Sequence, residues 1–266
     1  MQTSGDWAGR GIGGNLFLQV GFVMKARLLA VSALSALALV GTAYADGTEA
    51  PKSHWSGSVS LTSDYRFRGV SQTDRDAALQ GDLQYNGSNG LYAGAWASNV
   101  NIPGTSGTEV DLYAGYDYAL TENTSVGAEF IYYLYPSASD PDFNYYEIIG
   151  KVSHKMGNIG ASLEVAYGPD VAGQTTWAFT GGVDAKLIDS VYLFKDGISA
   201  SGHFGHQMVD GSGTDYNFYD VGLTATAGAF ALDVRYSGTD LNKADCGGTD
   251  RCEGGLVVTG SLSFGG

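Results

Sequence analysis

The feature that most constrains the fold is a period-two alternation of side-chain character, which begins near Trp55 and continues to the C-terminus. From Trp55 to Arg68, aromatic, aliphatic and glycine residues occupy most of one face, while Ser, Thr, Asp and Arg occupy the other. A period of two is the period of a β-strand. We therefore expect an all-β chain with twelve strands, over residues 55–68, 77–86, 91–100, 108–120, 124–135, 143–155, 159–168, 174–187, 197–207, 214–226, 229–239 and 255–264.

Composition agrees with this expectation and excludes several other classes of protein. The chain has 40 glycines and 17 tyrosines, which are poor helix formers, so a helix bundle is excluded. Hydrophobic residues make up 44% of the chain, which argues against disorder. The net charge is −14, with 14 Lys and Arg against 28 Asp and Glu. Nucleic acid is excluded as a partner, because phosphate binding needs positive charge.

Short and long connections between these segments largely alternate along the chain. Short links of turn-forming residues are expected at 87–89, 121–123, 156–158 and 227–228, and longer links around 69–76, 101–107, 136–142, 208–213 and 240–254. This pattern is typical of a single antiparallel transmembrane β-barrel with short periplasmic turns and longer outer loops. We expect the barrel to cover residues 55–264.

A secreted soluble barrel or sandwich is the rival fold, since its strands alternate as well. Tyrosines near the expected strand ends favour the membrane barrel, because an aromatic girdle marks the membrane interfaces. These tyrosines are Tyr65, Tyr85, Tyr118, Tyr135, Tyr167 and Tyr236. If apolar faces meet lipid, the polar faces line the lumen.

The N-terminal residues predict export. Residues 24–45 have the basic start, apolar run and Ala43-Tyr44-Ala45 cleavage pattern of a signal peptide. Residues 1–23 precede it, and we interpret them as an extension from a misplaced start. Residues 46–54 then form a short periplasmic segment. In an oxidising compartment Cys246 and Cys252 are expected to form a disulfide, with a free or labile pair as the alternative.

Four stretches carry a family resemblance: Ser63 to Gln72, Ala78 to Gly81, Gly90 to Trp96 and Glu109 to Tyr116. Together they resemble the TorF family of porin-like proteins, known also as the Gcw_chp domain, of Gram-negative bacteria. The resemblance runs from about residue 53 to the C-terminus and implies an outer-membrane β-barrel whose transported substrate is unassigned. The aromatic last strand resembles the signal that the barrel assembly machinery recognises in such proteins. Outer-membrane lipid, lipopolysaccharide and this machinery are the partners implied.

The polar faces predict the residues that line the lumen, and acids outnumber bases among them. The predicted lining residues are Asp64, Arg66, Arg68, Gln80, Asp82, Gln84, Glu109, Asp111, Asp117, Glu129, Glu147, Lys151, Glu164, Asp184, Lys186, Asp233 and Arg235. A water-filled pore lined in this way favours cations. The alternative is a narrow barrel plugged by facing acids and bases. Asp64, Arg66 and Arg68 share one face near the outer end of the first segment, and form either a constriction or an internal salt-bridge ladder.

These observations predict a channel for passive diffusion of small hydrophilic solutes, with no cofactor and no metal. Neither a Gly-x-Ser-x-Gly elbow nor a His-Glu-x-x-His pair is present in the sequence, and His203 and His206 point to opposite faces of one strand, so we do not expect an enzyme. An outer-membrane lipid hydrolase is the enzymatic alternative. A non-conducting barrel that binds through residues 240–254 is the other alternative. The sequence leaves the oligomeric state open.

Overall fold

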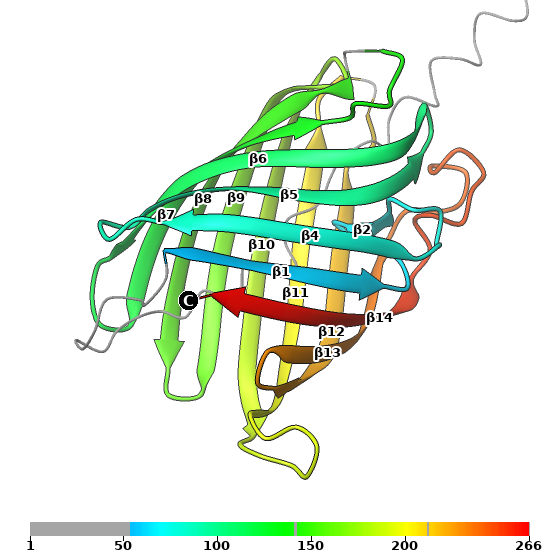
Figure 1. The fold of residues 1–266 in the computed structure, drawn as a ribbon. Coiled ribbons are helices and arrows are strands. Elements are labelled where there is room, and N and C mark those ends of the chain that lie inside the picture. The colour runs from blue at the N-terminus through cyan, green and yellow to red at the C-terminus, as the bar shows by residue number, and fades with distance from the viewer. Residues whose placement is uncertain (1–53, 141–142, 212, 266) are drawn as a thin grey trace, which may run out of the picture.

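Twelve strands close into one antiparallel barrel in the computed structural model, which describes residues 54–140, 143–211 and 213–265 (Figure 1). The predicted signal peptide and upstream extension lie outside the described residues, as do residues 46–53 of the predicted periplasmic segment. The barrel strands are β1 (Trp55–Thr62), β4 (Ala78–Asn86), β5 (Leu91–Ile102), β6 (Thr105–Ala119), β7 (Thr124–Leu134), β8 (Tyr145–Met156), β9 (Ile159–Val171), β10 (Gln174–Ile188), β11 (Gly197–Val209), β12 (Tyr216–Ala227), β13 (Phe230–Thr239) and β14 (Gly255–Gly265).

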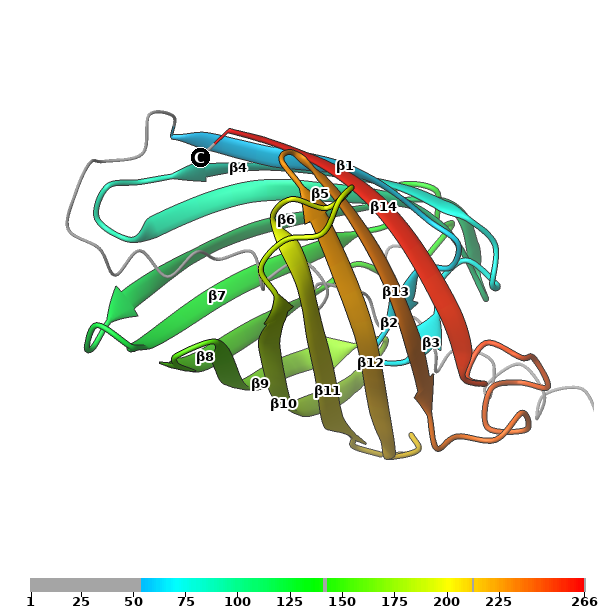
Figure 2. The same cartoon turned by 90° about the horizontal axis from the view of Figure 1, so that it is seen from below.

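Each strand pairs with its sequence neighbour, and β1 closes the ring by pairing with both β4 and β14. The predicted all-β fold with twelve strands is confirmed. Two short strands, β2 (Arg66–Phe67) and β3 (Val70–Ser71), pair with each other and lie inside the ring (Figure 2).

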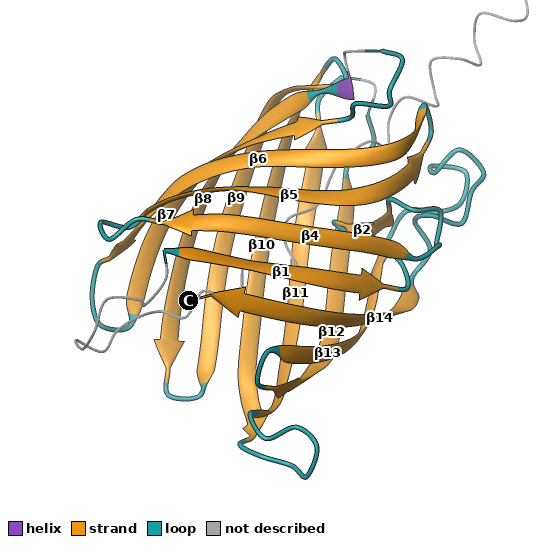
Figure 3. Cartoon of the chain, in the orientation of Figure 1, coloured by secondary structure: helices purple, strands orange, loops and turns teal. Residues whose placement is uncertain are grey.

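The connections lie at two rims (Figure 3). We call one the loop rim, because it holds the connections 63–77, 103–104, 135–144, 172–173, 210–215 and 240–254. The other is the turn rim, which holds the connections 87–90, 120–123, 157–158, 189–196 and 228–229 together with the start of β1 and the end of β14. The predicted longer link at 101–107 is wrong, because β5 and β6 extend past the expected ends and leave a two-residue turn at 103–104.

The apolar side chains of the barrel face outward and the polar ones face inward. Leu79, Leu163 and Leu256 are among the many aliphatic residues more than 60% exposed on the outer surface. Residues of the opposite parity, such as Ser60 and Glu147, are buried inside. This arrangement is expected of a barrel surrounded by lipid, and it is the reverse of a soluble sandwich, whose apolar faces pack against each other.

A core fills the half of the barrel nearest the loop rim. Ile131, Tyr133, Tyr145 and Ile149 belong to it, and so do Tyr65 and Phe67 from the segment between β1 and β4. Inward residues nearer the turn rim, such as Asp82 and Arg235, are only half-buried. The interior is therefore packed in one half and more accessible in the other.

Two sequence predictions on strand one and on the tyrosines are wrong. The first strand ends at Thr62 instead of continuing to Arg68, because the chain then turns into the barrel with positive φ at Arg68 (44°) and Gly69 (80°). Tyr65 and Tyr135 do not belong to an interfacial girdle. Both are buried inside the barrel, where their hydroxyls donate to Glu109.

Candidate functional site

The segment Ser63–Ala77, which we call the inner hairpin, folds into the lumen and carries β2 and β3. Asp64 stabilises its bend, since its carboxylate accepts hydrogen bonds from Arg66 Nε (2.7 Å) and Ser71 Oγ (2.6 Å). Phe67 and Gln72 are fully buried against the barrel interior. The predicted cluster of Asp64, Arg66 and Arg68 therefore belongs to this hairpin and not to a barrel strand.

Arg68 at the tip of the inner hairpin reaches the wall opposite β1 and β4. Its Nη1 and Nη2 donate to Glu147 Oε1 and Oε2 of β8 at 2.9 and 3.0 Å, and Nη1 also donates to Gln207 Oε1 of β11 at 2.9 Å. The Tyr133 hydroxyl donates to the same carboxylate at 3.1 Å. A bidentate guanidinium–carboxylate pair is the strongest common polar contact. Arg68 therefore links the hairpin to the far side of the barrel.

Glu109 of β6 makes the second set of contacts with the inner hairpin. It accepts hydrogen bonds from the hydroxyls of Tyr65 (3.1 Å) and Tyr135 (2.9 Å). The ring of Tyr65 also packs on Trp96 of β5, with the ring centroids 5.2 Å apart. The hairpin is thus anchored to the wall at β5 and β6 as well as at β8 and β11.

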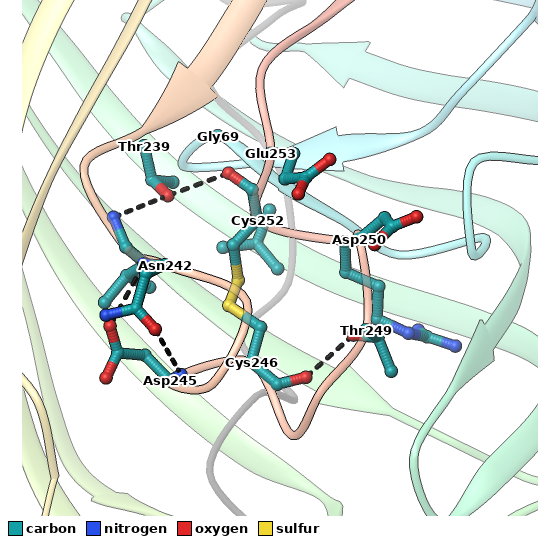
Figure 4. Close-up of a disulfide and its surroundings, with 12 residues drawn as sticks. Gly69, Thr239, Asn242, Asp245, Cys246, Thr249, Asp250, Cys252 and Glu253 are labelled. Atoms are coloured by element: carbon teal, nitrogen blue, oxygen red, sulfur yellow. Dashed lines mark hydrogen bonds between the residues drawn. A yellow bond between two sulfur atoms is a disulfide. The ribbon is translucent and has the colours of Figure 1, made fainter.

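The loop 240–254 covers the inner hairpin from the loop rim (Figure 4). Cys246 and Cys252 form a disulfide, are almost fully buried, and pack with Val70 of the hairpin. The loop and the hairpin are also joined by backbone contacts: Ser71 N donates to Arg251 O (2.9 Å), and Arg66 Nη1 donates to the carbonyl of Glu253 (2.8 Å). The loop therefore holds the hairpin inside the barrel.

Ion pairs also contribute to the contacts of the loop 240–254, both with the inner hairpin and within the loop. Arg251 Nε lies 3.2 Å from Asp74 Oδ1, and Arg251 Nη1 donates to the Asn101 carbonyl at 2.6 Å. Lys243 pairs with Asp250 within the loop itself. The hydrogen bond from Lys243 holds the pKa of Asp250 below its ordinary value.

The remaining predicted lumen residues lie on inward faces, mostly in the half nearer the turn rim. Two compact groups form there. Glu129 accepts hydrogen bonds from Tyr92 (2.5 Å) and Lys151 (3.2 Å), and Arg235 pairs with Asp233 (2.9 Å). The inward residues outside these pairs are Gln80, Asp82, Gln84, Asp117, Glu164, Asp184 and Lys186. Asp111 of β6 lies instead in the packed half, where it is fully buried near Glu109.

Several interior residues were missed by the sequence analysis. Asp220 of β12 pairs with Arg235 and accepts a hydrogen bond from His203 Nδ1 at 3.0 Å, which makes a polar group of four residues with Asp233. The parity of its strand places Asp220 inward, so the signal was present in the sequence. Gln207 and Tyr133 bind the Arg68–Glu147 pair, and nothing in their local sequence indicates a partner on the inner hairpin.

No helix in the described part of the chain is long and apolar enough to cross a membrane. Within residues 54–265, where described, no group of three or more His, Cys, Asp or Glu side chains could hold a metal ion.

A closed antiparallel barrel with an apolar exterior and polar residues inside defines the class of transmembrane β-barrels. Within that class, the chain belongs to the Gcw_chp family, described as "Bacterial protein of unknown function", whose model matches residues 45–258. The match is to the Gcw_chp domain, and the TorF assignment stays a prediction. The comparison with curated proteins gives no significant match.

Solved porin structures share this fold. A structure titled "KdgM porin" has a TM-score of 0.52 at 10% sequence identity and covers 79% of this chain and 99% of that chain. The NanC porin has a TM-score of 0.53 at 11% identity, over 79% of this chain and 98% of that one. A KdgM porin "in complex with disordered oligogalacturonate" has a TM-score of 0.51 at 11% identity, over 79% and 99%. At such identities these likenesses show the fold alone.

Proposed function

We propose that the protein is a porin-like channel of a Gram-negative outer membrane, through which small hydrophilic solutes diffuse passively with a preference for cations. The observation that carries the proposal is the distribution of side chains around the barrel. Exposed Leu, Val, Ile and Phe cover the outside, as lipid requires, and charged residues lie inside, as an aqueous path requires. The loop rim would face the exterior and the turn rim the periplasm. The proposal involves no chemistry and no cofactor.

The inner hairpin would form the constriction of this channel. It lies where the lumen is most tightly packed, and side chains from β6, β8 and β11 bind it. Solutes would enter from the turn rim, where inward acids such as Asp82 are only half-buried. Passage through the outer half would depend on movement of the hairpin, which is held both by polar contacts with the wall and by the packing of Tyr65, Phe67 and Val70.

Charge in the accessible half supports the cation preference. Lys151 and Arg235 are each paired with a carboxylate, so their charge is compensated locally. Asp82, Glu164 and Asp184 lie inward and form no ion pair within 4.0 Å among the described side chains. Unpaired acids lower the energy of a cation in the lumen and raise that of an anion.

The proposal is tested by single-channel recording of the purified chain in a planar bilayer under a salt gradient. We expect discrete steps and a cation-shifted reversal potential. Replacing Asp82 or Glu164 with the corresponding amide should reduce that shift, whereas Asp250→Asn in the outer loop should leave it nearly unchanged. An anion-shifted potential would contradict the charge assignment, and silence from folded protein would contradict the channel.

A binding role for the loop 240–254 gains no support from its contacts. The loop packs its disulfide against the inner hairpin and directs the backbone carbonyls of Arg251 and Glu253 toward hairpin donors. These contacts fit a clamp on the hairpin better than a loop held free for an external ligand.

A further inference from the structure

Asp111 is the one acid of the constriction whose charge has no hydrogen-bond donor among the described residues. Its side chain is 0% exposed, and neither Oδ1 nor Oδ2 accepts a hydrogen bond. Glu109, two residues earlier on the same face of β6, binds two tyrosine hydroxyls, and Glu147 binds Arg68. Three carboxylates, which interact electrostatically, thus share one guanidinium. An uncompensated buried carboxylate is costly, so the site is short of positive charge and of donors.

Aromatic rings stand on both sides of Asp111. Trp96 of β5 and Tyr133 of β7 are its direct partners in the strand register, and all three side chains face inward. Directly opposed side chains in an antiparallel pair have Cβ atoms about 5 Å apart. Both rings are buried, and Tyr65 of the inner hairpin packs on Trp96. A carboxylate between aromatic rings is the environment that attracts an organic cation.

The inner hairpin already presents such a cation to the neighbouring acid. The Arg68 guanidinium binds Glu147 through two hydrogen bonds and lies over the ring of Phe67, 4.4 Å from its centroid. Asp111 likewise combines a carboxylate with neighbouring aromatic rings, but the described part of the chain supplies no cationic donor to it. The two free carboxylate oxygens need N–H donors, which a primary ammonium or a guanidinium carries and a quaternary ammonium lacks.

We propose that Asp111, flanked by Trp96 and Tyr133, binds the primary ammonium or guanidinium group of a small organic cation that enters the lumen. This inference rests on the proposed function and names the class of solute that the constriction recognises. The site is fully buried and Tyr65 of the hairpin packs on Trp96, so binding requires the hairpin to shift. That shift takes the Arg68 guanidinium away from Glu147, and the positive charge of the bound cation then compensates the buried carboxylates. A bare metal ion fits less well, because the described carboxylates do not converge into a metal-binding group.

The experiment is calorimetric titration of the purified full chain in detergent at low salt, with 1,4-diaminobutane as the probe. We expect saturable binding by the wild type and at least a roughly tenfold loss of affinity in Asp111→Asn, because a charge-assisted hydrogen bond is lost. Asp250→Asn is the control, since Asp250 lies in the outer loop 240–254 and pairs there with Lys243, away from the lumen, and it should leave affinity unchanged. Arg68→Ala should bind more tightly, because it frees Glu147 and loosens the hairpin.

Trp96→Leu keeps the charge of Asp111 and removes one ring, so it should weaken binding without abolishing it. Heat-modifiable mobility in gels establishes that each variant is folded. Equal affinity of wild type and Asp111→Asn, or no binding by wild type and Arg68→Ala, would overturn the site. So would equal binding of tetramethylammonium or of calcium, because neither donates an N–H. If the protein binds diaminobutane but never conducts, the binding site is supported and the channel function is refuted. If it conducts but does not bind diaminobutane, the channel function is supported and the binding site is refuted.

Discussion

Removal of the Arg68 guanidinium should release the inner hairpin from the far wall of the barrel. Both side chains of the Arg68–Glu147 pair are almost fully buried, at 4% and 1% exposure, and Gln207 adds a third hydrogen bond. Breaking a buried pair by removing one partner costs about 3–5 kcal/mol, because the other charge is left uncompensated. Only the inserted state pays this cost, since Glu147 can be hydrated when the hairpin withdraws. In Arg68→Ala the population of withdrawn hairpin should therefore rise about 100- to 5,000-fold.

Single-channel recording measures this effect directly, as a longer open time or a larger conductance in Arg68→Ala than in the wild type. Arg75→Ala is the matched control on the same hairpin. Its ion pair with Glu253 is 3.7 Å long and solvent-exposed, so the expected cost is below about 1 kcal/mol. Indistinguishable recordings from Arg68→Ala and Arg75→Ala would refute the interpretation that the Arg68–Glu147 pair holds the hairpin in place.

The disulfide, the tightly packed glycines and the outer-loop ion pair can be tested in the same way. Replacing both Cys246 and Cys252 with Ser removes a disulfide that stabilises so short a loop by about 2 kcal/mol. The inner hairpin should then become accessible to protease in folded barrels, and unchanged digestion would contradict the idea that the loop 240–254 holds the hairpin in place. Gly94→Ala places a methyl group against the Tyr113 ring and the Leu83 carbonyl and should cost about 1–3 kcal/mol, seen as a lower melting temperature, whereas Gly150→Ala has open space and should be neutral. The hydrogen bond from Lys243 lowers the pKa of Asp250 in the folded protein. The pair therefore stabilises the fold at pH values above the carboxyl pKa of the unfolded chain, and this stabilisation is lost as the pH falls through the lowered pKa of the folded state. In Lys243→Gln, carboxyl NMR should show the pKa of Asp250 returning toward 3.8.

The barrel strands could be predicted because lipid outside and water inside impose opposite polarity on alternate residues. Segments such as β13, with Phe230, Leu232 and Val234 outward and Asp233 and Arg235 inward, carry that signal within a few residues. The strand ends were harder to place, since β5 and β6 extend past the expected link without any change in pattern. Register between neighbours follows from this alternation and from the lengths of the turns.

The inner hairpin could not be predicted in the same way. The alternation continues through Tyr65 and Phe67 as if β1 went on, although these side chains pack inside the barrel. The turn at Arg68 requires positive φ in a residue other than glycine, which local sequence does not indicate. What holds Arg68 there is Glu147, 79 residues away, together with Gln207 beyond it. Long-range contacts of this kind leave no periodic trace in the sequence.

We propose that the barrel conducts through a lumen narrowed by the inner hairpin. The most direct test compares planar-bilayer recordings of the wild type with a variant in which residues 65–74 are replaced by a short Gly-Ser link. We predict cation-selective steps in both, with the larger conductance in the variant. A folded, heat-modifiable variant that is silent, or one that conducts no better than the wild type, would show that the inner hairpin does not narrow a conducting lumen.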